Sequence, residues 1–248
     1  MQTHPLVFAD DLAKGERLFQ LHCAGCHGPK GEGGKGPNLA MSRLVRSPAE
    51  EELIKVITDG IDGTQMPTSR LDKGQIKEVA EFVRHLGALT PEAVPGNAQR
   101  GEALYFSKGN CTPCHAIKGR GGASGPDLTE IGLRRGSAYL RLALTNPEAD
   151  VPKGFSSFGP DTSIPQNFLL VRVVTKDGQA LTGVRVNEDT FSIQVRDSSD
   201  QVRSFFKSEL TELHKDWGKS PMPGYGEVFS STELDDVVAF LASLGLKR

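Results

Sequence analysis

Two short runs hold all four cysteines of the chain, and in each run two thiols two residues apart are followed at once by an imidazole: Cys23-Ala24-Gly25-Cys26-His27 and Cys111-Thr112-Pro113-Cys114-His115. This C-x-x-C-H spacing is typical of covalent haem c attachment. The thiols form thioethers with the haem vinyl groups, and the histidine supplies an axial nitrogen to iron. The sequence therefore predicts two covalently bound haem c groups, with thioethers from all four cysteines and iron ligands from His27 and His115.

Other chemistries use a C-x-x-C pair. A thioredoxin-like redox pair belongs at a strand-to-helix junction, which neither run resembles. A zinc site built from both pairs would leave the two adjoining histidines without a role. Haem attachment accounts for every cysteine and both histidines.

A Gly-Pro turn follows each run at a similar spacing, in Gly36-Pro37-Asn38-Leu39 and Gly125-Pro126-Asp127-Leu128. A carbonyl of Pro37 or Pro126 can accept the Nδ1–H of the haem histidine, which orients the ring and raises its basicity as a ligand. A single such turn is ordinary punctuation, but two in register favour this role.

Methionine is the expected second axial ligand. Met66 and Met222 are each followed by proline, and each stands just before an apolar helical pattern that begins near Asp72 or Ser230. A thioether ligand stabilises ferrous iron and raises its potential. Met41 is the alternative at the first haem, and His214 is the alternative at the second, where Met222 is the only methionine after the attachment run.

The chain contains an internal repeat. Gly15-Glu16-Arg17-Leu18-Phe19 precedes the first cysteine run, and Gly101-Glu102-Ala103-Leu104-Tyr105 precedes the second. Each reads as a helix whose glycine permits close approach of another helix. A further helix is expected in the first copy, with Ser47 as its N-cap. Residues 1–90 and 98–248 are therefore expected to form two domains, joined by a linker at 91–97.

The second copy carries an insertion at about residues 148–217. Within it, residues 167–210 change from helical periodicity to strand periodicity, with a hairpin signal at Asp177-Gly178. The expected fold is mostly α, with two helical domains, the second of which carries a small all-β, barrel-like module. The module serves either as a structural brace or as a docking surface.

Composition limits the function classes. The formal charge of −2 and the lack of a basic stripe argue against nucleic acid as a partner. The 248 residues contain no apolar stretch of membrane-spanning length. Haem attachment of this kind belongs to the periplasmic side of a bacterial membrane, so we expect that a signal or a lipid anchor was removed before the first residue.

Each copy resembles a class I cytochrome c domain, in the order helix, C-x-x-C-H, Gly-Pro-x-Leu, helix, Met-Pro, closing helix. The resemblance implies an all-α haem domain, ligated by His27 with Met66 or by His115 with Met222. The second copy is also similar to the haem-binding domains appended to large bacterial dehydrogenases, through Asn146-Pro147-Glu148 and Ser220-Pro221-Met222-Pro223.

The resulting hypothesis is a periplasmic dihaem electron-transfer protein, or an electron-transfer subunit, rather than an enzyme in its own right. It accepts single electrons from a dehydrogenase and passes them to an acceptor such as a terminal oxidase or another cytochrome. The alternative is a dihaem peroxidase with one open haem site.

Overall fold

The computed structural model describes residues 9–41, 44, 46–62, 64–89, 93–149, 151 and 169–246. Residues 1–8 of the first predicted domain, residues 91–92 of the predicted linker, and residues 152–168 of the insertion lie outside this part. The chain divides into two compact units, Met1–Ala93 with Leu133–Gly136, and Val94–Gly132 with Ser137–Arg248.

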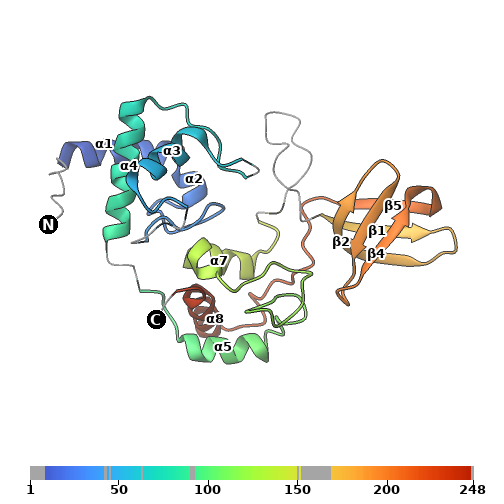
Figure 1. Cartoon of the computed structure of the whole chain (residues 1–248). Coiled ribbons are helices and arrows are strands. Elements are labelled where there is room, and N and C mark those ends of the chain that lie inside the picture. Colours follow the sequence, from blue (N-terminus) through green and yellow to red (C-terminus); the bar gives the residue numbers. More distant parts are fainter. Residues whose placement is uncertain are drawn as a thin grey trace. The chain divides into compact units, whose positions relative to one another are not determined.

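The described part of Met1–Ala93 in the first unit contains the helices α1 (Ala9–His22), α2 (Ala24–His27), α3 (Glu50–Asp59) and α4 (Lys73–Ala88). α1 crosses α4 (Figure 1), and the rings of Phe19 and Phe82 meet there with centroids 5.3 Å apart. A Cβ on Gly15 would collide with the backbone carbonyl of Glu78. The predicted role of this glycine in a close helix crossing is confirmed.

Helix α4 begins where the sequence predicts. The carboxylate of Asp72 accepts a hydrogen bond from the backbone N–H of Gln75 at 2.9 Å, and the Gln75 side chain accepts from the N–H of Asp72 at 3.1 Å. These two reciprocal bonds satisfy N–H groups that a helix start leaves free.

Helix α3 begins later than predicted. Ser47 does not cap it, because the N-cap is Ala49, whose backbone N–H donates to the Glu52 carboxylate at 3.0 Å. Ser47 is buried, and its carbonyl accepts a hydrogen bond from Arg84 at 2.9 Å. A tertiary contact therefore uses this residue in place of the local capping bond.

The second unit repeats the helical plan with α5 (Ala98–Phe106), α7 (Ser137–Thr145) and α8 (Ser231–Ser243), while α6 (Ile131–Arg134) belongs partly to each unit. α5 packs against α8 (Figure 1), the rings of Tyr105 and Phe240 lie 5.6 Å apart, and Gly101 abuts the carbonyl of Asp236. The predicted capping box at Ser230 and Glu233 begins α8. None of the helices in the described ranges is long and apolar enough to cross a membrane.

The inserted segment forms one antiparallel sheet in the order β4-β3-β2-β1-β5. Its strands are β1 (Leu170–Thr175), β2 (Ala180–Glu188), β3 (Ser192–Arg196), β4 (Val202–Phe206) and β5 (Leu210–Asp216), with a 3-10 helix, η2 (Lys207–Glu209), before the last. Gly178 adopts φ 84° in the turn predicted between β1 and β2. The core of the sheet consists of Leu169, Val171, Val173, Ile193 and Val195.

The expectation of a mostly α protein is wrong. Helix accounts for about 38% of the structure and strand for about 16%. The haem domains contain long loops around short helices, and the sheet gains a fifth strand, β5, whose polar sequence Leu210–Asp216 lacks a clear strand pattern. In the described part the ladder ends at the edge strands β4 and β5, so its pairings form an open sheet and not a closed barrel.

Candidate haem sites

Both cysteine runs fold into a single backbone turn that brings the histidine over the first cysteine. The N–H of His27 donates to the carbonyl of Cys23 at 2.9 Å, and the N–H of His115 donates to that of Cys111 at 3.0 Å. In the first run this turn is the short helix α2. The three residues between these partners are thus enclosed by the same backbone bond in both domains.

The two thiols of each run differ in exposure. Cys26 and Cys114 are exposed, Cys23 is half-buried, and Cys111 is buried. Burial, together with the neighbouring Cys26, raises the pKa of Cys23 to about 11. Burial likewise raises the pKa of Cys111 to about 11. Before haem attachment both inner thiols are therefore protonated at neutral pH.

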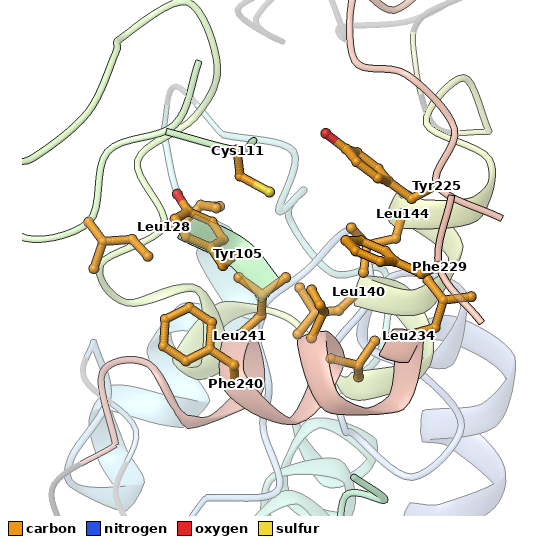
Figure 2. Close-up of a cluster of buried hydrophobic side chains, with 13 residues drawn as sticks. Tyr105, Cys111, Leu128, Leu140, Leu144, Tyr225, Phe229, Leu234, Phe240 and Leu241 are labelled. Atoms are coloured by element: carbon orange, nitrogen blue, oxygen red, sulfur yellow. The ribbon is translucent and has the colours of Figure 1, made fainter. Parts of the chain in front are cut away.

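Figure 2 shows the surroundings of the second run. The sulfur of Cys111 points into an apolar cluster that includes the rings of Tyr105, Tyr225 and Phe229, with Leu241 of α8 on the other side. This environment suits a porphyrin edge, because aromatic and aliphatic side chains present a large apolar surface.

The haem histidines are oriented by the two proline carbonyls. Nδ1 of His27 lies 2.9 Å from the carbonyl oxygen of Pro37, and Nδ1 of His115 lies 2.8 Å from that of Pro126. Since a carbonyl only accepts, each Nδ1 carries the hydrogen and each Nε2 is left with a lone pair. Burial lowers the pKa of both imidazoles, against the opposing effect of the proline carbonyls. The neutral form that metal ligation requires is thereby favoured.

Each histidine ring also lies flat against a glycine. A Cβ on Gly36 would come within 2.7 Å of Cε1 of His27, and a Cβ on Gly125 would come within 2.7 Å of Cε1 of His115. The N–H groups of Gly36 and Gly125 donate to the carbonyls of Cys26 and Cys114 at 2.8 Å. From the sequence these glycines are expected only as turn residues, although their recurrence directly before each proline is a signal of a further role.

The residues present fit a covalently attached haem. His27 is only 7% exposed, yet in the described part of the chain its Nε2 has no hydrogen-bond partner. A buried polar nitrogen without a partner is costly unless a ligand satisfies it. A haem iron bound there would satisfy it, and the two thiols one turn away would anchor the porphyrin.

The two candidate methionines occupy matched loops. The N–H of Met66 donates to the hydroxyl of Thr64 at 3.2 Å, and that of Met222 donates to the hydroxyl of Ser220 at 3.1 Å. Met222 packs, half-buried, against the cluster that contains Cys111. Met66 is also half-buried.

The rival ligand of the second site, His214, lies in the sheet. His214 belongs to β5, opposite Arg172 of β1, and its Nε2 lies 3.0 Å from the carboxylate of Asp216. Its side chain is 69% exposed. Met41 follows the Gly-Pro loop and is half-buried. The sheet therefore already has a partner for the one histidine that competes with Met222.

Comparison with known families agrees with the repeat of two similar domains in the chain. A family model described as cytochrome c oxidase, cbb3-type, subunit III matches residues 10–83, and one described as cytochrome c matches residues 98–180. The chain contains two cytochrome c domains. The prediction of two covalently bound haem c groups is thereby confirmed.

Relatives of these domains include subunits of cbb3-type cytochrome c oxidases. The CcoP subunit of Helicobacter pylori strain 26695 is 32% identical over 142 residues, which are 53% of this chain and 47% of that protein. The FixP subunit of Rhizobium etli is 31% identical over 178 residues, 66% of this chain and 61% of that protein. The CcoP subunit of Azospirillum brasilense is 30% identical, with coverages of 66% and 62%. The chain thus spans about half the length of the Helicobacter protein and less than two thirds of the other two.

Proposed function

We propose that the chain is a periplasmic dihaem electron carrier that passes single electrons towards a terminal oxidase of the cbb3 type. The observation that carries the proposal is the repeated histidine geometry, in which His27 and His115 each rest on a glycine and bond a proline carbonyl. Two sites of the same construction in one chain suit an electron relay. The names of the relatives support an oxidase as the acceptor.

In this proposal His27 with Met66 would hold the iron of the first domain, and His115 with Met222 would hold the iron of the second. Haem c, when bound, supplies a one-electron Fe(III)/Fe(II) couple. The chain's own residues do the rest: Pro37 and Pro126 hold the imidazoles, and the thioethers of Met66 and Met222 would exclude water and peroxide from a bound iron. A closed sixth position separates an electron carrier from a dihaem peroxidase.

A periplasmic dehydrogenase is the proposed donor, on the strength of the similarity around Asn146-Pro147-Glu148 and Ser220-Pro221-Met222-Pro223. The β-rich insertion is proposed as the part of the second domain that braces the Met222 loop. We propose the same domain limits that the sequence predicts: residues 1–90 and residues 98–248, joined by a linker at residues 91–97.

The first test is the weak far-red band that a methionine ligand gives to ferric haem, measured per haem in the oxidised holoprotein. Met66→Ala and Met222→Ala are each expected to remove half of the band, because each variant opens one iron. Met41→Ala and His214→Ala are the matched controls and are expected to leave it unchanged. If the far-red band is unchanged in Met222→Ala and the half-reduced protein turns over peroxide, the assignment as an electron carrier is wrong and the protein is a dihaem peroxidase.

A second test addresses the acceptor. The reduced protein is mixed with a purified cbb3-type oxidase in a stopped-flow instrument, and haem oxidation is followed at several salt concentrations. Electron transfer on the timescale of oxidase turnover is expected. Absence of transfer to the oxidase, with reversible redox waves in the carrier itself, would leave the carrier role standing and remove the oxidase as its partner.

A further inference from the structure

The methionine loops of the two domains are reached by very different stretches of chain. Met66 follows α3 within one short loop, whereas the whole β-rich insertion lies between α7 and Met222. A longer connection has more conformations to lose when its end is held in place. The second loop therefore needs contacts of its own to stay at the haem site.

One anchor is common to both domains. The residue three positions after the methionine donates its backbone N–H to the end of the preceding helix. Ser69 donates to the carbonyl of Thr58 in α3 at 3.1 Å, and Tyr225 donates to the carbonyl of Leu144 in α7 at 2.7 Å. This bond fixes each methionine loop to its helix but leaves the loop free of the cysteine run.

The side chain at this position differs between the domains. The hydroxyl of Tyr225 donates to the backbone carbonyl of Gly109 at 2.8 Å, just before the cysteine run. The hydroxyl of Ser69 instead accepts a bond from Leu71 within its own loop at 3.1 Å. Figure 2 shows Tyr225 beside Cys111 and above Phe229.

The tyrosine is firmly held. Its side chain is buried, with the residue 8% exposed, and its ring stacks on Phe229 with centroids 5.3 Å apart and planes inclined by 16°. A buried hydroxyl with a well-formed bond is costly to detach, because separation leaves the Gly109 carbonyl without a partner. The Tyr225–Gly109 bond thus joins two segments that are 116 residues apart in sequence.

We propose that Tyr225 is a positioning residue of the second haem site: it clasps the Met222 loop to the cysteine run and so keeps Met222 on the iron. The inference rests on the proposed His115/Met222 ligation. In the second domain this clasp does what the short loop between α3 and Met66 does in the first domain. The first domain has Ser69 at the matching position, and among its described residues the Ser69 hydroxyl bonds only within its own loop.

The test is competition by free imidazole in the ferric holoprotein, with Tyr225→Phe as the variant. This change keeps the ring and its stacking and removes only the hydroxyl. Imidazole displaces axial methionine, so its affinity reports how firmly each methionine is held. We expect imidazole to bind one haem about three- to tenfold more tightly in Tyr225→Phe, the range that loss of one hydrogen bond implies, and the other haem as in wild type.

Ser69→Ala is the matched control and is expected to leave both imidazole affinities unchanged. Unaltered affinity in Tyr225→Phe, in a protein where Met222→Ala removes half of the far-red band, would overturn the clasp and leave the ligation intact. A far-red band that Met222→Ala leaves unchanged would overturn both. Equal tightening at the two haems would also overturn the clasp, since a general loss of stability would then explain the result.

Discussion

Gly101 of α5 lies directly against the backbone carbonyl oxygen of Asp236 in α8, with no room between them for a methyl group. Gly15 of α1 stands in the same relation to the carbonyl of Glu78 in α4. Each domain thus contains the same kind of helix crossing. In both, a glycine lets the backbone of the partner helix come close, and a pair of aromatic rings packs beside it.

Gly101→Ala is expected to destabilise the second domain by about 1–3 kcal/mol, the usual cost of forcing extra volume into a packed contact. The backbone of α8 cannot yield as a flexible side chain would. The free energy of unfolding is measured by chemical denaturation with haem absorbance as the probe. Gly226→Ala, where an added Cβ meets nothing within 4 Å, is the control; equal losses in the two variants would contradict the close crossing.

Gly36→Ala is expected to push the imidazole of His27 away from the Pro37 carbonyl. Loss of that bond makes the imidazole a weaker base towards iron, so the midpoint potential of the first haem is expected to rise by roughly 20–60 mV, equivalent to about 0.5–1.5 kcal/mol. Gly125→Ala is expected to do the same at the second haem only. Potentiometric titration checks both, with Gly25→Ala as the control because its added Cβ meets nothing within 4 Å.

Asp236 makes the second domain sensitive to acid. Its carboxylate, 4% exposed, accepts hydrogen bonds from Arg100 at 2.7 Å and 2.9 Å and from the backbone N–H of Asn97 at 2.6 Å. The bonds from Arg100, and then that from Asn97, lower its pKa. A lowered folded-state pKa gives stability that is present above the ordinary value of 3.8 and lost as the pH falls through the folded value.

Asp236→Asn is therefore expected to cost stability at pH 7 and progressively less below pH 4. Denaturation midpoints of variant and wild type at several pH values test this, with haem absorbance of the second domain as the probe. A difference between the two proteins that stays constant down to pH 2 would show that the carboxylate charge contributes nothing.

Glu188, like Asp236, is a carboxylate with little exposure whose hydrogen bonds stabilise the fold, in this case the sheet. Burial by itself would raise its pKa, but hydrogen bonds from Lys207, Lys215 and Arg185 lower it to about 2. The nitrogens of Lys207 and Lys215 lie 2.8 Å and 2.9 Å from the carboxylate, whose side chain is 10% exposed. The carboxylate thereby ties the end of β2 to η2 and β5.

Glu188→Gln is expected to destabilise the sheet by about 1.5–3 kcal/mol at pH 7, in the range for a hydrogen bond to a charged group. Exchange of the backbone amides in β2 and β5 against deuterium should quicken, while exchange in α1 and α4 should not change. Glu212→Gln, on a side chain 59% exposed, is the matched control and is expected to have a small effect. Equal losses of stability in Glu188→Gln and Glu212→Gln would argue against a stabilising role for the hydrogen bonds to Glu188.

Local pattern predicted much of the helical framework. Asp72 and Ser230 cap their helices as expected, because a capping bond joins residues only three apart and needs no partner from elsewhere. Ser47 does not, because α3 begins two residues later, with Ala49 as its N-cap, while Ser47 is buried and bonded to Arg84 of α4. The strand β5 was missed for a related reason, as its residues alternate poorly and it is a strand because β1 pairs with it.

The covalent chemistry of this protein was determined by the sequence alone. Two thiols and an imidazole lie within five residues in each run, and the Gly-Pro runs that follow them recur in register. The clasp from Tyr225 to Gly109, the ring contacts of Gly36 and Gly125, and the open sheet were decided only by the tertiary structure. The physical reason is chain separation: a contact between distant segments depends on how every intervening element packs, and no local spacing encodes it.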